Sequence, residues 1–276
     1  MNYYKIRIRK VILYSVLLIG VIVTIAPFVW MISASLMPVG QANQFPPKFW
    51  PEKVTFEHYQ TLFSRLNVTR YFLNSIVISL SITGISLIFN SMAGFAFAKY
   101  RFAGKQKLFK LLLSAMVIPA QVTMLPLFLM LNRMGFINTY WGVIIPGMAS
   151  IYGIFLIRQY IISIPDSLIE SARIDGAHDF YIYWKIILPV AKPILVTLAL
   201  FTFMGAWNDF LWPLIVLTKD SMYTLPVVLA NLMGEHVQDT EMMMAGSVIT
   251  ILPIIIVFLA MQKYYLRGIM LGSVKE

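Results

Sequence analysis

The chain has 276 residues, of which 59% are hydrophobic and 12% are charged, and its mean hydropathy is +0.77. A soluble domain is usually about 45–50% apolar and 25% charged, so this composition excludes a soluble globule, and equally disorder, collagen-like repeats and coiled coil. Without cysteine there is no disulfide scaffold, thiolate metal site or cysteine nucleophile. The 22 Lys and Arg residues outnumber the 12 Asp and Glu residues. In so apolar a chain, this excess indicates basic loops beside a lipid bilayer rather than a nucleic-acid partner.

Six charge-poor runs are long enough to cross a membrane, since about 20 apolar residues span a hydrocarbon core. They predict an all-α polytopic membrane protein, a single transmembrane domain over residues 1–276. Its six helices are expected at about residues 11–32, 71–98, 111–132, 134–157, 193–218 and 242–262, the fifth interrupted by Asp209. The first run could instead belong to a signal peptide. It exceeds the usual hydrophobic length of about 7–15 residues, however, and has no clear cleavage site.

The positions of the basic residues orient these helices by the positive-inside rule. With both termini in the cytoplasm, sixteen Lys and Arg residues fall on the inner side and six on the outer side. The largest inner group lies in residues 99–110, between the second and third runs. The sequence therefore predicts that both termini are cytoplasmic.

The residue patterns of familiar catalytic chemistry are missing from the sequence. The three histidines are far apart and have no metal-ligand partner at helical spacing, and there is no G-x-S-x-G motif. A phosphate-binding G-x-x-x-x-G-K-[ST] loop is also missing, because Gly104-Lys105 is followed by Gln106. Asp209 is the only ionisable residue in the six runs, whereas an ion-coupled carrier normally keeps several. We therefore expect no catalytic residue, metal or cofactor in this chain, and an energy source in a partner.

The longest inner segment, residues 158–192, begins with a short helix signal. Pro165 suits a first helical position, Asp166 suits the positive end of a helix, and Gly176 offers a left-handed stop. Together they predict a helix of about ten residues. Its expected apolar stripe consists of Leu168, Ile169 and Ala172.

A second short helix is predicted after the Asp175-Gly176 turn, with His178 or Asp179 as its cap. Two amphipathic helices that meet at a glycine could dock to a partner protein. They could equally lie on the lipid interface, and the residues by themselves leave this choice open. The second helix is expected to end at Pro189, and its apolar positions follow i, i+3, i+4, i+7 spacing at Phe180, Tyr183, Trp184 and Ile187.

The same segment resembles a known family motif. Glu170-Ser171-Ala172, Gly176 and then Ile187-Leu188-Pro189 resemble the EAA loop of ABC-importer permeases, with Ser171 where the family usually has alanine. Residues 173–177, Arg-Ile-Asp-Gly-Ala, narrow the resemblance to MalG-like carbohydrate-uptake permeases. Further matches follow in order along the chain: Asn74-Ser75, Phe102-x-Gly104, Leu125-Pro126, Trp207-Asn208-Asp209-Phe210, Leu252-Pro253, and Gly272-Ser273-Val274-Lys275.

The resemblance implies the type I ABC importer permease fold and a role as one permease subunit of a sugar importer in a bacterial or archaeal plasma membrane. It implies a homologous second permease, ABC ATPase subunits that bind ATP and magnesium, and an extracellular or periplasmic sugar-binding protein. In such a system residues 158–192, the coupling loop, meet the ATPase. The residues that the resemblance assigns to coupling are Leu168, Glu170, Ser171, Ala172, Asp175, Gly176, Ile187, Leu188 and Pro189.

The substrate path is less narrowly defined by the sequence. Trp207, Asn208 and Asp209 could stack on and hydrogen-bond a sugar, and the resemblance implies that this segment faces the cavity. Equally, the tryptophan could belong to an interfacial belt and the asparagine to a helix–helix hydrogen bond. Two rival functions remain, namely an ABC permease for a polyol phosphate, peptide or amino acid, and a stand-alone secondary carrier. No membrane run contains Lys or Arg, which favours a neutral substrate.

Overall fold

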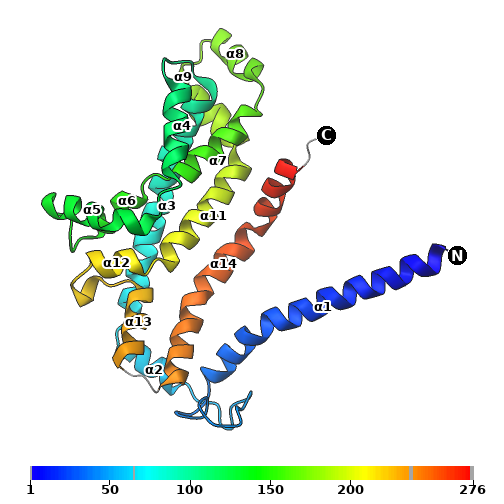
Figure 1. Cartoon of the computed structure of the whole chain (residues 1–276), viewed down its shortest axis with the longest axis vertical. Helices are drawn as coiled ribbons and strands as arrows, with labels where there is room; N and C mark the ends of the chain where they lie inside the picture. The colour runs from blue at the N-terminus through cyan, green and yellow to red at the C-terminus, as the bar shows by residue number, and fades with distance from the viewer. Residues whose placement is uncertain (1, 65, 236–238, 274–276) are drawn as a thin grey trace. The chain divides into compact units, whose positions relative to one another are not determined.

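A computed structural model describes residues 2–64, 66–235 and 239–273, and every regular element in these ranges is helical (Figure 1). Several basic positions used to orient the chain lie outside what is described. These are Arg65, Lys275 and the side chains of Lys5, Lys263 and Arg267. The histidine His236 and the motif residue Val274 also lie outside the described residues. The chain divides into two compact units, Met1–Val68 with Leu229–Leu252, and Thr69–Val228 with Pro253–Glu276.

The first unit contains α1 (Asn2–Ala34), α2 (Glu57–Ser64) and the beginning of α14 (Thr240–Ser273). The segment between α1 and α2 is held by polar contacts to α14. The Ala42 amide donates to Oε1 of Glu241 at 2.7 Å, and Thr240 Oγ1 donates to Oδ1 of Asn43 at 2.8 Å. Glu241 is wholly buried, and its position in the first turn of α14 suits a carboxylate because the helix N-terminus is positive.

The second unit contains the elements that form the candidate site. In chain order they are α3 (Val68–Lys99), α4 (Lys105–Ala115), α5 (Ala120–Arg133), α6 (Tyr140–Gly147), α7 (Ile151–Ile162), α8 (Asp166–Ile174), α9 (Asp179–Tyr181), the π-helix η1 (Ile182–Ile187), α10 (Leu188–Val190), α11 (Lys192–Asn208), α12 (Leu211–Val216) and the 3₁₀ turn η2 (Asp220–Met222). The helix α13 (Leu225–Glu235) and α14 each contribute residues to both units.

Four stretches in the described residues are long and apolar enough to cross a membrane, and six if two bent helix pairs each count as one span. The four are Arg7–Ala34, Val68–Lys99, Tyr140–Ile162 and Thr240–Gln262. The bent pairs are Lys105–Ala115 with Ala120–Arg133, at 103°, and Asp179–Val190 with Lys192–Asn208, at 80°. The predicted run at 134–157 is displaced in the structure, since Thr139 caps α6 by accepting from the Gly142 amide and the helix begins at Tyr140.

Three predicted runs are not continuous helices. The run at 134–157 crosses residues 148–150, between the end of α6 at Gly147 and the start of α7 at Ile151. The run at 111–132 crosses the break between α4 and α5, where Pro119 stands at the N-cap of α5 with extended ψ. Proline has no amide hydrogen and disfavours helical geometry in the residue before it, which accounts for the break. The run at 193–218 is divided after Asn208, because Asp209 is extended (φ −68°, ψ 121°) and a new helix, α12, begins at Leu211.

Buried polar contacts and close backbone approach fix α3 against α7. Asn90 on α3 is fully buried, and its Oδ1 accepts from the Ser150 amide at 2.9 Å, just before α7 begins. A Cβ at Gly153 would lie 2.5 Å from Nδ2 of Asn90, and one at Gly94 would lie 2.6 Å from the Ile157 side chain. Small residues let membrane helices approach closely, and here they allow a side-chain amide to cap a neighbouring helix.

Candidate functional site

The coupling loop contains the predicted short helix as α8, Asp166–Ile174. Pro165 is the N-cap rather than the first helical residue. Gly176 has φ +81°, its amide donates to the Arg173 carbonyl at 3.0 Å, and the Ala177 amide donates to the Ala172 carbonyl at 2.9 Å. This pair of bonds is a Schellman motif, which satisfies the last carbonyls of the helix and requires a left-handed residue. The stop at Gly176 is therefore where the sequence predicted it.

Helix α8 buries one face on its own unit and presents the other outward. Ile169 and Ala172 are 5% and 9% exposed and pack in a core with Ile161, Ile182 and Ile187. Ala172 is therefore not free to enter a cleft of a partner, because its side chain is already covered by this chain. The exposed residues of α8 include Leu168, Glu170, Ser171 and Ile174, together with Asp166, Ser167 and Arg173.

The second short helix differs from the periodic prediction. His178 is its N-cap, with Nδ1 accepting from the Tyr181 amide at 3.1 Å. Beyond α9 the chain becomes the π-helix η1, in which hydrogen bonds join residues five apart. Ile182 and Ile187, five apart, are consequently both fully buried. The four positions predicted as one apolar face therefore have different surroundings. Tyr183 and Ile187 face the core, whereas Phe180 and Trp184 are 60% and 43% exposed.

The remaining predicted coupling residues occupy two kinds of place. Asp175 is the exposed C-cap of α8, and no heavy atom lies within 4 Å of where a Cβ at Gly176 would be. Leu188 is half-buried against the core that contains Ile187, and Pro189 lies in the first turn of α10. The structure thus brings Ala172, Ile187 and Leu188 together inside the unit, and leaves the rest of the predicted set on its surface.

Both ends of α8 are tied to the end of α3. Lys99 Nζ lies 2.6 Å from Oδ1 of Asp166 and also donates to the Ile164 carbonyl, before the helix. After the helix, Asp179 accepts from Arg173 at 2.9 Å and from the hydroxyl of Tyr100. The hydrogen bond from Lys99 lowers the pKa of Asp166, and the hydrogen bond from Arg173 lowers the pKa of Asp179. In Figure 1, α8 lies at one end of the unit, next to α9.

The second unit also contains a cavity of about 620 Å³. It lies among α3, α5, α6, α7, α11 and α12, all labelled in Figure 1. Its polar lining consists of Ser86, Thr123, Ser150, Tyr152, Thr202, Asp209 and Trp212. A space of this size is within the usual range for small-molecule sites, about 300–1,000 Å³.

The three predicted substrate-path residues separate in the structure. Trp207 is 1% exposed and packs edge-on to Phe72 and stacked on Phe203, with ring centroids 5.6 and 5.8 Å away. Asn208 is exposed and donates to the Met204 carbonyl at 2.9 Å. Only Asp209 lines the cavity, where its Oδ1 accepts from the Trp212 amide at 3.3 Å.

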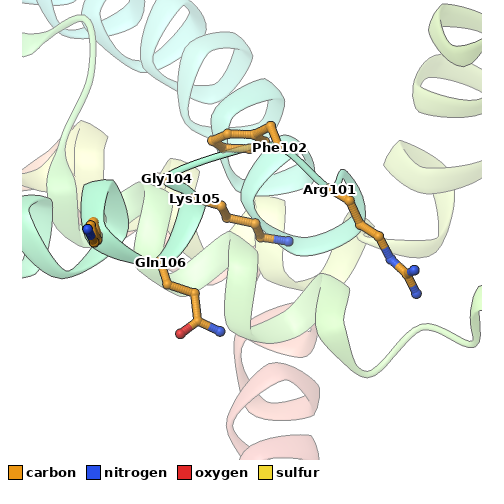
Figure 2. A pocket seen from close by; sticks show the side chains of 6 residues that line it. Arg101, Phe102, Gly104, Lys105 and Gln106 are labelled. Atoms are coloured by element: carbon orange, nitrogen blue, oxygen red, sulfur yellow. The ribbon is translucent and has the colours of Figure 1, made fainter.

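A second hollow, of about 470 Å³, lies beside the turn that joins α3 to α4 (Figure 2). Its basic side chains are Arg101, Lys105 and Lys107. Lys105 Nζ donates to the Tyr100 carbonyl at 2.7 Å, and burial, followed by the charges of Arg158 and Arg101, lowers the pKa of Lys105. This amine therefore caps the end of α3, where helix carbonyls lack amide partners.

Residues 90–270 match the family described as the binding-protein-dependent transport system inner membrane component. The chain belongs to this family. The arabinooligosaccharides transport system permease protein AraQ of Halalkalibacterium halodurans is 37% identical to it over 92% of each chain. The lactose transport system permease protein LacG of Rhizobium radiobacter is 30% identical, over 98% of this chain and 97% of the relative.

Solved structures agree with this family assignment. A chain from the crystal structure of a bacterial ABC transporter involved in the import of the acidic polysaccharide alginate aligns with a TM-score of 0.83 and 27% identity. The alignment covers 94% of this inner membrane component and 97% of that chain. The fold is therefore the six-helix, type I ABC importer permease fold, in a multi-pass plasma-membrane protein.

Most residues that line the cavity of this inner membrane component were not predicted from the sequence. Ser86, Thr123, Tyr152 and Thr202 are single hydroxyl residues in apolar runs, and such residues usually bond to their own helix. A spacing signal was nevertheless present. Ala120, Thr123, Met124 and Leu127 follow i, i+3, i+4, i+7 spacing, and so do Thr202, Gly205, Ala206 and Asp209.

Proposed function

We propose that this protein is a permease subunit of an ATP-driven importer for a sugar or oligosaccharide, and that it performs no catalysis itself. The single observation that carries the proposal is the outward surface of α8, a helix stopped at Gly176 that presents Glu170 and two apolar side chains from a tethered loop. The names of the two relatives, which concern arabinooligosaccharides and lactose, support the substrate class.

The proposed ATPase contact uses the surface residues of the coupling loop. Leu168 and Ile174 are 41% and 86% exposed, on either side of Glu170. Apolar side chains around a charged one suit a protein interface, where a central contact is surrounded by groups that exclude water. Asp175 and Gly176 leave room for close approach of a partner, and Ser171 adds a hydroxyl. Ala172, Ile187 and Leu188 then attach the loop to the transmembrane helices instead of meeting the ATPase.

The proposed assembly has further subunits. ATPase modules act as two-fold pairs and this chain supplies one coupling loop, so a homologous second permease is required. ATP and magnesium belong to the ATPase subunits. The family is binding-protein-dependent, which supports a sugar-binding protein on the outer side. The excess of Lys and Arg in the coupling loop and in residues 99–110 supports a cytoplasmic location for these segments and for both termini.

The test is reconstitution in liposomes from separately purified subunits. We expect labelled oligosaccharide uptake only when this chain, a second permease, ATPase subunits, binding protein and magnesium ATP are all present. Each subunit is omitted in turn as a control. Uptake by this chain alone under an ion gradient would contradict the proposal, because it would identify a secondary carrier.

A further inference from the structure

We propose that the 620 Å³ cavity is a sugar-binding subsite within this chain, selective for a neutral polyhydroxylated ligand over an anionic one. This inference rests on the proposed function and adds to it in two ways. It states that this subunit contacts the transported sugar itself, and it names the charge class of that sugar.

Two of the helices that line the cavity each contribute one face. Ala120, Thr123, Met124 and Leu127 are one face of α5, and Thr202, Gly205 and Ala206 are one face of α11, which ends at Asn208, directly before Asp209. Residues three and four apart lie above one another on a helix, so each set forms a continuous wall. Most positions on these walls are small or hydroxylated, which leaves space between the helices and gives that space polar groups.

Some of the polar groups are already used by the fold and others are available to a ligand. Thr123 Oγ1 donates to the Ala120 carbonyl, and Ser150 Oγ accepts from the Gly153 amide. Among the described residues, by contrast, the hydroxyls of Tyr152 and Thr202 have no hydrogen-bond partner. Together with Asp209, they provide hydroxyl and carboxylate oxygens around one space, which suits the hydroxyl groups of a sugar.

One aromatic ring in the cavity wall is held in a fixed orientation. Trp212 is 7% exposed, and its indole N–H donates to the Gly142 carbonyl at 3.1 Å. Its indole N–H is thus satisfied by the protein, and the small part of the ring that reaches the cavity is apolar. A sugar ring has hydroxyls at its edge and carbon-bound hydrogens on its faces, so an apolar patch beside oxygen acceptors complements both.

The charge of the lining decides which sugars fit. No Lys, Arg or His is among the residues that line the cavity, and Asp209 is the one carboxylate. A hydroxyl that donates to a carboxylate forms a charge-assisted bond, roughly twice as strong as a neutral one. An anionic sugar would bring a like charge into a partly desolvated space with no cation to offset it. The lining therefore favours neutral sugars and disfavours phosphorylated or uronic ones.

The first experiment is cysteine labelling of the assembled importer in nanodiscs, which is direct because the natural chain has no cysteine. Thr202→Cys is placed in the cavity, and Gly84→Cys is a control elsewhere on α3. We expect water-soluble methanethiosulfonates to label Thr202→Cys, the cationic reagent faster than the anionic one. Neutral arabinotriose or lactose should slow labelling by about fivefold or more, whereas digalacturonate should not. Absence of labelling, or equal protection by neutral and anionic sugars, would overturn the proposal.

The second experiment fills the cavity. At Gly205, as at Gly84, a Cβ would meet no heavy atom within 4 Å, and both residues are helical with ordinary φ. A side chain can therefore begin at either position without a clash at its Cβ. We expect Gly205→Leu to lower oligosaccharide uptake about tenfold or more, and Gly84→Leu to stay within about twofold of wild type. Equal uptake by both variants would overturn the subsite.

The two proposals fail in different ways. If the wild-type assembly shows no ATP-dependent uptake of any sugar, the proposed function is wrong. If the wild-type assembly transports but Thr202→Cys is not protected and Gly205→Leu transports normally, the importer function stands. The subsite is then refuted, and the sugar contacts belong to the other permease.

Discussion

Lys99, the last residue of α3, is joined to Asp166, the first residue of α8, by an ion pair of 2.6 Å across 67 positions of sequence. The lysine side chain is 8% exposed and the aspartate 74%. The adjacent Tyr100 bonds to Asp179 beyond the other end of α8. The residues at both ends of α8 are therefore connected to the end of α3, through Lys99 and Tyr100.

Loss of the Lys99–Asp166 ion pair should weaken the coupling between ATP hydrolysis and transport. In Lys99→Met we expect ATPase subunits to co-purify normally, because the outer face of α8 is unchanged. Sugar transported per ATP hydrolysed should fall by about two- to fivefold, as expected for one partly exposed ion pair. Lys107→Met, an exposed lysine in the same segment, is the matched control and should keep the wild-type ratio. A wild-type ratio in both variants would show that α3 does not transmit the movement.

The ion pairs of the coupling loop should be insensitive to pH in the neutral range. Lys99 and Arg173 lower the pKa values of Asp166 and Asp179 below the ordinary value of 3.8. A carboxylate with a lowered folded pKa contributes stability that is present above its unfolded pKa and is lost as the pH falls through the folded pKa. The difference in thermal stability between wild type and Asp166→Asn should therefore be constant from about pH 8 to 5 and shrink below about pH 4. A difference that already shrinks between pH 8 and 6 would implicate another titrating group.

Gly176 and Gly135 form a matched pair for testing the turn. Both have positive φ, +81° and +77°, and a Cβ at either would meet no heavy atom within 4 Å. Valine should cost about 1–2 kcal/mol of backbone strain at each position. Only Gly176→Val should also reduce ATPase co-purification and stimulated hydrolysis, because only Gly176 lies in the coupling loop. Equal ATPase binding by the two variants would place the turn outside the interface.

Glu170 should matter to the assembly and not to the fold. It is exposed, and no partner for its carboxylate is found among the described residues. In Glu170→Ala the melting temperature of the isolated chain should be unchanged. Affinity for the ATPase subunits should fall by about 1.5–3 kcal/mol, the value of a charge-assisted hydrogen bond. Titration of labelled ATPase onto nanodiscs measures this directly, with Glu57→Ala, at an exposed position in α2, as control. Unchanged affinity would remove Glu170 from the contact.

Asn90 should contribute to the stability of the second unit. Its Nδ2 donates to Ser86 at 2.7 Å while its Oδ1 accepts from Ser150, all at a fully buried position. Asn90→Leu leaves the Ser150 amide without its partner, which should cost about 1–3 kcal/mol. Thermal unfolding of the purified chain measures this loss. Asn208→Leu, at an exposed position, should cost far less, and equal costs would contradict the capping role.

The sequence by itself determined the membrane class, the short helix before Gly176 and the family of this protein. Each of these features depends on residues that are close together in the sequence. Uninterrupted apolar length decides whether a segment enters lipid, and a glycine with helix-ending neighbours decides where a helix stops. The EAA motif was recognisable for the same reason, since its glycine and the residues that precede it act locally.

Only the tertiary structure decided which predicted residues face a partner and which face the core. Ala172 is covered by Ile182 and Ile187 of a π-helix whose five-residue spacing the 3.6-residue pattern could not predict. Residues two apart on a helix point to different sides, and only the packing decided that the side of Trp207 meets Phe72 and Phe203 while Asp209 lines the cavity. The cavity and the Lys99–Asp166 pair combine segments that are far apart in sequence. These segments meet only because whole helices pack together, and that packing cannot be predicted from any one segment.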